Sequence, residues 1–155
     1  MREILFRGKR TDCEAWVEGD LIQAFRGNQL SSCSIMPNTP TAYCWKIDPE
    51  TVGQYTGLTD KNGVRIFEGD IVERVSDGEQ AVISWLKYFA CFGLSFDGWC
   101  CGFDNYDDNL PSDFEVIGNI HDNPELFETA AKPADKYIAQ SGLAPATDNF
   151  ELMEG

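Results

Sequence analysis

Short hydrophobic runs separated by turn-forming residues make up most of the chain as far as about residue 120. Between Thr41 and Ile47, bulky aromatic and aliphatic residues alternate with smaller or polar ones, which predicts a strand with one buried face. Turn-forming pairs recur at short intervals, at Asn62-Gly63, Gly69-Asp70, Asp77-Gly78 and Asp97-Gly98. This pattern predicts a small β-barrel or a rolled sheet rather than alternating βαβ units.

The N-terminal part of the chain is predicted to begin with a hairpin. Its first strand covers Arg2 to Arg7, and its second runs from Ala15 to Phe25. Gly19-Asp20 is expected to break the second strand as a bulge or a tight turn. Ser31 to Met36, which is small and polar on one side, predicts a weak strand.

The segment from Thr51 to Val72 contains the densest turn signals. Thr59 to Gly63 predicts a hairpin connection that ends in Asn-Gly, and Val64 to Phe67 predicts the returning strand. Gly69-Asp70 then turns the chain into a strand from Ile71 to Val75. Glycine allows the sharp backbone turn and an aspartate side chain binds turn amides, so the predicted role of Asp70 is structural.

Further strands and a helix are predicted towards the C-terminus. Asn123 suits a helix N-cap and Pro124 the first helical position, which predicts a short helix from Pro124 to about Ala131. Pro133 to Gln140 is a possible second helix. The predicted strands are Gln80 to Leu86, Tyr88 to Phe96, Trp99 to Phe103 and Phe114 to Ile120.

The charge of the chain is strongly negative and unevenly distributed. The formal net charge of the chain is −14. Much of it lies in residues 104–155, which contain 12 acidic and 2 basic side chains. A protein that binds a nucleic acid duplex needs lysine and arginine to replace counterions on phosphate, so direct nucleic-acid binding is not expected. The apolar runs are too short for a secretory signal or a membrane span, and we expect a protein of the cytoplasm.

The six cysteines are at positions 13, 33, 44, 91, 100 and 101. None forms a C-x-x-C pair, and the neighbours Cys100 and Cys101 would point to opposite faces of a strand. His121 is the only histidine, so the usual ligand pairs of a zinc site are missing. We expect buried or half-buried free thiols, and no cofactor is predicted.

The candidate chemical groups are few. Asp104, Asp107 and Asp108 lie in an acidic loop whose oxygen atoms suit calcium or magnesium, but their spacing does not match an EF-hand. They are interaction candidates, with a solvated loop as the favoured interpretation. His121 and Asp122 could form an acid/base pair, yet no nucleophile motif accompanies them. No catalytic residue is predicted.

The four tryptophans, at positions 16, 45, 85 and 99, all lie on predicted strands. They are expected in the core or in an interface rather than as a platform for a ligand. Several of them exposed together would indicate an interaction surface.

Three segments together resemble the YopX-like family of phage and prophage proteins. They are REILFRGKRTDCEAWVEGDLI (2–22), TVGQYTGLTDKNGVRIFEGDIV (51–72) and FEVIGNIHDNPELF (114–127), which span most of residues 2–127 in the order of the family. The resemblance implies a phage or prophage origin and a mainly β protein with an SH3-like barrel. It carries no established activity and no catalytic residues.

The predicted fold is therefore mainly β. An N-terminal β region (1–48) precedes an SH3-like small barrel (49–121), and a short helix and an acidic tail (122–155) follow. The tail contains apolar residues that could cover the chain itself or a neighbouring subunit.

Three functions compete on this basis. The first is an accessory protein that acts through contact with a host or phage protein, or with itself as a homo-oligomer. The second is an acidic decoy or inhibitor of a host nucleic-acid-binding protein, because a carboxylate array can occupy a basic groove. The third is a metal-dependent enzyme that uses the acidic loop. The absence of a catalytic signature favours the first.

Overall fold

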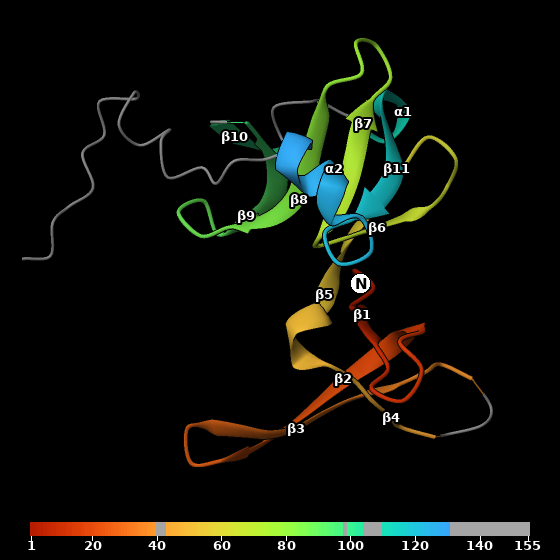
Figure 1. Ribbon diagram of the computed structural model, residues 1–155, viewed down its shortest axis with the longest axis vertical. Coiled ribbons are helices and arrows are strands. Elements are labelled where there is room, and N and C mark those ends of the chain that lie inside the picture. Colours follow the sequence, from red (N-terminus) through yellow and green to blue (C-terminus); the bar gives the residue numbers. More distant parts are fainter. Residues whose placement is uncertain (40–42, 98, 104–109, 131–155) are drawn as a thin grey trace, which may run out of the picture.

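The computed structural model describes residues 1–39, 43–97, 99–103 and 110–130. In this part of the chain, two antiparallel sheets lie one above the other and β5 rises from one towards the other (Figure 1). The mainly β prediction is confirmed. No helix of the described residues is long and apolar enough to cross a membrane.

The first sheet has six strands in the order β4-β3-β2-β1-β5-β6. A 3-10 turn, η1 (Pro49–Thr51), leads into β5. The strands are β1 (Phe6–Lys9), β2 (Trp16–Arg26), β3 (Gln29–Met36), β4 (Trp45–Lys46), β5 (Gly53–Thr59) and β6 (Arg65–Phe67).

The second sheet has five strands in the order β10-β9-β8-β7-β11. This order leaves β10 and β11 at opposite edges, so this part of the predicted SH3-like small barrel is an open sheet and not a closed barrel. The elements are β7 (Asp70–Arg74), β8 (Gln80–Leu86), β9 (Cys91–Phe96), β10 (Trp99–Gly102), α1 (Leu110–Asp113), β11 (Phe114–Asn119) and α2 (Pro124–Ala130).

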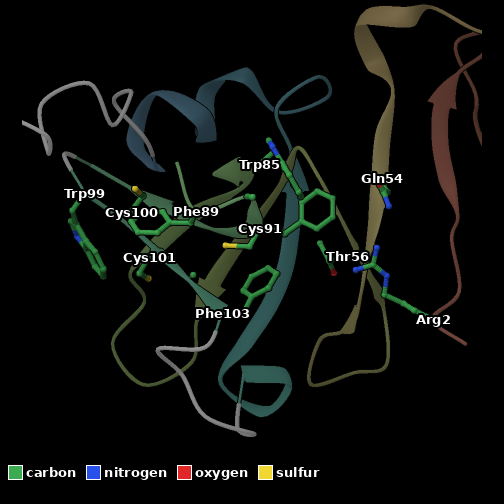
Figure 2. A pocket seen from close by; sticks show the side chains of 13 residues that line it. Arg2, Gln54, Thr56, Trp85, Phe89, Cys91, Trp99, Cys100, Cys101 and Phe103 are labelled. Atoms are coloured by element: carbon green, nitrogen blue, oxygen red, sulfur yellow. The ribbon is translucent and has the colours of Figure 1, made fainter. Parts of the chain in front are cut away.

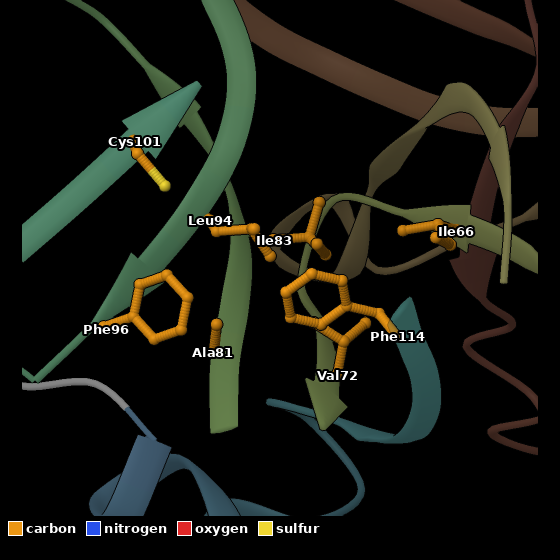
Figure 3. Close-up of a cluster of buried hydrophobic side chains, with 8 residues drawn as sticks. All are labelled: Ile66, Val72, Ala81, Ile83, Leu94, Phe96, Cys101 and Phe114. Atoms are coloured by element: carbon orange, nitrogen blue, oxygen red, sulfur yellow. The ribbon is translucent and has the colours of Figure 1, made fainter. Parts of the chain in front are cut away.

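Both faces of the second sheet are covered by other parts of the chain. On one face, Leu126 of α2 packs with Ile117 and Ile120 against Ile71 and Val82. On the other face, a larger cluster includes a residue of β6 from the first sheet. Figure 3 shows this cluster, which consists of Ile66, Val72, Ala81, Ile83, Leu94, Phe96, Cys101 and Phe114. Because apolar burial is the main favourable term in folding, this cluster is what joins the β5–β6 hairpin to the second sheet.

Several sequence predictions are confirmed. The N-terminal hairpin is present as β1 and β2, although β1 starts at Phe6 rather than at Arg2. Gly63 and Gly69 have φ values of +80° and +86°, as expected of turn residues. Asp70 Oδ2 accepts a hydrogen bond from the Phe67 amide at 2.7 Å, which is the structural role predicted for it.

The prediction that Gly19-Asp20 breaks the second strand is wrong, because β2 runs unbroken from Trp16 to Arg26. A Cβ atom at Gly19 would lie only 2.0 Å from the backbone oxygen of Met36. Glycine is therefore needed for the close approach of two backbones and not for a turn. Ser31 to Met36, predicted as weak, belongs to the eight-residue strand β3.

The strand predicted from Thr41 to Ile47 is much shorter in the structure. Only Trp45–Lys46 forms β4, and Tyr43 is exposed. Trp45 pairs with Ile35 and lies under the guanidinium group of Arg10, 3.5 Å from the ring centroid. Residues 40–42 lie outside the described part of the chain, as does the possible helix from 133 to 140. The domain boundaries after residues 48 and 121 stay predictions.

Candidate functional site

A cleft of about 1240 Å³ lies between the two sheets. One wall is formed by Arg2 and by Gln54 and Thr56 of β5 (Figure 2). The other wall comes from β8, β9 and β10 and the turn between β8 and β9, and is mostly apolar. Its aromatic members are Trp85, Phe89, Phe92, Trp99 and Phe103, and its thiols are Cys91, Cys100 and Cys101. The site therefore combines a hydrophobic wall with a small polar one.

Ring packing and turn geometry position the aromatic wall. The Trp85 and Phe92 rings meet edge to face with centroids 5.0 Å apart, and Trp99 stacks on buried Phe96 at 4.1 Å. Both arrangements are among the favourable geometries of aromatic pairs. The turn after β8 leaves Phe89 65% exposed, while Trp85 is 49% exposed. The cleft thus presents aromatic surface that the chain itself leaves partly in solvent.

The polar wall is less available for binding than its composition indicates. The Thr56 hydroxyl donates to the backbone oxygen of Ile66 at 2.8 Å and accepts from the Leu58 amide at 3.2 Å. These bonds hold the bend in β5, where Gly57 has a φ of +90°. The Arg2 side chain extends beside Gly57, with its Cδ atom 3.6 Å from the place of a Cβ there. Arg2 is the charged group among the described lining residues.

The Cys100 thiol of the cleft is not an activated nucleophile. Burial, with a smaller contribution from Cys91, raises the pKa of the Cys100 thiol above its ordinary value. A raised pKa keeps the thiol protonated at neutral pH, whereas the thiolate is the reactive form. All six cysteines are free, but Cys13 and Cys44 are exposed, contrary to the expectation that the thiols are buried or half-buried.

A cluster of charged and aromatic side chains outside the cleft joins the two sheets, and we call it the inter-sheet clamp. Its members are Arg7 and Lys9 of β1, Trp16 of β2, Asp70 of β7 and Asp122 in the turn after β11. At its centre, Arg7 Nη2 lies 2.6 Å from Asp70 Oδ1, and both side chains are largely buried. The Arg7 guanidinium also lies over the Trp16 ring, 4.7 Å from its centroid.

Burial disfavours the charged form of the Asp70 carboxyl group. Burial raises its pKa above the ordinary value, although the Arg7 cation and the Phe67 amide act in the opposite direction. Arg7 Nε is also buried and has no hydrogen-bond partner among the described residues. A buried ion pair of this kind is sensitive to loss of either partner.

The second arm of the clamp is Asp122. Its carboxylate accepts hydrogen bonds from Trp16 Nε1 at 2.7 Å and Asn119 Nδ2 at 2.9 Å, and it forms an ion pair with Lys9. These donors, with Asn119 contributing most, hold the pKa of Asp122 well below its ordinary value. Because this carboxylate already accepts from several groups, it is poorly placed to accept a proton from the neighbouring His121 during a reaction.

A smaller hollow of about 500 Å³ is lined in part by Arg7 and Asp70 of the clamp. The charged side chains in its described lining form two ion pairs, Arg7 with Asp70 at 2.6 Å and Arg65 with Glu18 at 3.1 Å. Since these charges are already satisfied within the chain, this hollow offers no obvious charge to a ligand.

The comparison with protein families agrees with this structure. The family model described as YopX protein matches residues 5–128. The chain belongs to the YopX protein family. Comparison with curated proteins gave no significant match. Among solved structures, protein EF1440 from Enterococcus faecalis is similar, with 26% sequence identity and a TM-score of 0.51 over 81% of this chain and 99% of that one.

The resemblance drawn from three sequence segments is thus confirmed, and the structure shows how those segments meet. The first YopX segment supplies Arg7 and Trp16, the second supplies Asp70, and the third supplies His121 and Asp122. His121 packs against Trp16 with ring centroids 5.9 Å apart. The most recognisable parts of the sequence therefore form the inter-sheet clamp, whose residues do not line the cleft.

Asp104, Asp107 and Asp108, the predicted interaction candidates, lie outside the described residues, and so do the tail residues from 131. The metal-dependent enzyme and the acidic decoy stay predictions for that reason. Elsewhere in the chain, over the described ranges, no group of three or more His, Cys, Asp or Glu side chains is placed to hold a metal ion.

Sequence reasoning missed the cleft as a site. The sequence did offer one signal, because several tryptophans exposed together would indicate an interaction surface. Trp85 and Trp99 do line the same cleft, whereas Trp16 and Trp45 lie beneath cations of the first sheet. Which of the four would share a surface depended on how the two sheets pack.

The lowered pKa of His121 predicts a pH dependence of stability. Burial, Arg7 and Lys9 lower this pKa, so the unfolded chain, with an ordinary value of 6.5, binds the proton more readily. Stability from this group is complete above pH 6.5 and is lost as the pH falls through the folded-state value. We expect His121→Asn to lose less stability than the wild type in this window, as measured by urea unfolding at a series of pH values. Parallel stability profiles of the two proteins would contradict the expectation.

Proposed function

We propose that this YopX-family protein is a phage or prophage accessory protein that acts in the host cytoplasm by binding another protein, and that the cleft between its sheets is the binding site. The observation that carries the proposal is the aromatic wall, in which Trp85 is 49% exposed and Phe89 65% exposed. Aromatic side chains are enriched among the residues that dominate binding energy at protein interfaces. The proposal assigns no catalytic step.

Exposure and continuity of the surface support this role. Tyr88 is 78% exposed and immediately precedes Phe89, so the β8–β9 turn presents two neighbouring aromatic residues to solvent. Scattered exposed hydrophobic residues need no explanation, whereas a contiguous apolar patch beside a concave surface is typical of an interaction site. Burial of a large side chain of this kind contributes about 1.5 to 3 kcal/mol.

Affinity purification from infected or lysogenic cells tests the proposal, with the tagged full-length chain as bait. We expect the wild-type bait to recover a partner protein that the Phe89→Ala bait does not recover, because the substitution removes an exposed ring from the rim of the cleft. The matched control is Tyr43→Ala, which removes a similarly exposed aromatic side chain (70%) from the segment between β3 and β4. The retained protein is then produced in pure form and its affinity for each variant is measured by calorimetry.

The expected result is an affinity about ten times weaker for Phe89→Ala and an unchanged affinity for Tyr43→Ala. Equal affinities of the wild type and the two variants for the partner would show that the cleft is not the binding site. Recovery of no protein specific to the bait would show the same.

We also propose that the protein associates with itself. Ile22 and Phe25 of β2 are exposed on the first sheet, and exposed apolar strand residues favour pairing between copies of a chain. Light scattering over a range of concentrations tests this second contact independently of the cleft. A monomer at the highest concentration would refute self-association and leave the binding of another protein untouched.

A further inference from the structure

We propose that the cleft recognises an apolar segment that carries a carboxylate, and that Arg2 binds this carboxylate. This inference rests on the proposed function and names the chemistry of the partner. Arg2 is the cation of the described lining, and the described lining contains no aspartate or glutamate. In a chain with 26 acidic residues, a large cleft with a cation and without described carboxylates differs in charge from the rest of the protein.

The charge of Arg2 is not used within the described part of the chain. Arg7, Arg65 and Arg74 each form an ion pair with a carboxylate, at 2.6, 3.1 and 2.7 Å. For Arg2, no ion pair or hydrogen bond is found among the described residues, and its aliphatic stem lies beside Gly57. Its guanidinium group lies next to Thr56 on the polar wall (Figure 2). It is therefore available to a ligand.

The surroundings of Arg2 favour a carboxylate next to hydrophobic groups. A guanidinium group presents two parallel N–H donors to a carboxylate, and this pairing strengthens when water is excluded. A bound apolar segment would exclude water by covering Trp85 and Phe89 on the opposite wall. Since Thr56 already donates and accepts within the chain, Arg2 is the group that fixes the orientation of the segment.

The same geometry argues against a nucleic acid as the ligand. One arginine matches one carboxylate, whereas a strand of nucleic acid needs several cations along its phosphates. The formal charge of −14 would repel such a strand. A peptide segment with one acidic residue among hydrophobic ones avoids most of this repulsion.

Selection from a phage-displayed library of random dodecapeptides tests the inference, with the full-length wild-type protein as the target. We expect the enriched peptides to contain an aspartate or glutamate next to aromatic or aliphatic residues. A synthetic enriched peptide should bind Arg2→Gln about five to ten times more weakly than the wild type, and Arg2→Lys should retain part of the affinity. Replacing the acidic residue of the peptide with its amide should weaken wild-type binding by a similar factor and have little effect on Arg2→Gln.

Salt dependence provides a readout that a merely structural role of Arg2 would not change. Wild-type affinity should fall as sodium chloride is raised, and affinity of Arg2→Gln should vary less. Peptides that depend on Phe89 but not on Arg2 would overturn this inference while supporting the proposed function. Peptides that depend on neither residue, or no enrichment at all, would oppose both. Arg2-dependent binding of a dodecathymidylate probe would replace carboxylate recognition with phosphate recognition.

Discussion

Replacing Arg7 with methionine is expected to lower the free energy of unfolding by about 3 to 5 kcal/mol, because it leaves Asp70 buried without its cation. Asp70 is 2% exposed in its side chain, and burial already raises its pKa. A group with a raised folded-state pKa contributes its full stability below the unfolded value of 3.8, and loses it as the pH rises through the folded-state value. The loss caused by Arg7→Met should therefore be largest at neutral pH and smaller in acid.

Urea unfolding followed by tryptophan fluorescence measures this effect. The matched control is Lys61→Met, since Lys61 and Glu115 have the same 2.6 Å separation as Arg7 and Asp70 but are much more exposed. That variant should change stability by less than about 1 kcal/mol, because solvent screens an exposed pair. Arg7→Met combined with Asp70→Leu should recover part of the loss. Equal effects of the two single substitutions would show that the clamp is not a buried electrostatic contact.

The second large effect is expected at Phe96. Phe96→Ala should lower the free energy of unfolding by about 3 to 5 kcal/mol, because the ring is 1% exposed within the cluster of Figure 3. The same substitution removes the surface on which Trp99 stacks, 4.1 Å away between centroids. Binding in the cleft should therefore weaken even under conditions in which the variant stays folded.

Phe89→Ala is the counterpart of this experiment, because it deletes the same side chain from an exposed position. Its stability should change by about 0.5 kcal/mol or less, although its affinity in the cleft should be about ten times weaker. Thermal unfolding and calorimetric binding, measured on both variants, separate a residue that supports the wall from one that contacts the partner. A stability loss at Phe89 as large as that at Phe96 would mean that the Phe89 ring is buried rather than exposed at the rim of the cleft.

Sequence patterns correctly predicted those turns and helices that depend on the conformational preferences of neighbouring residues. The Asn-Gly turn at Gly63, the corner at Gly69-Asp70 and the helix that starts at Pro124 follow from the conformational preferences of single residues, and the structure contains all three. The predictions were wrong where contact with a distant segment of the chain determines the local conformation. A glycine such as Gly19 often marks a break in a strand. Here the backbone of Met36 lies so close that only glycine fits, and the strand continues through it.

Residue preferences and motif order act over short stretches of chain, so the sequence was sufficient to predict a mainly β protein of the YopX family and the position of most of its turns. The location of the site depends on the tertiary structure. Arg2 and Phe89 lie 87 positions apart, and no pattern in either segment shows that they face the same cleft. The packing of one sheet on the other, with Arg7 and Asp70 buried between them, is what brings the two walls together.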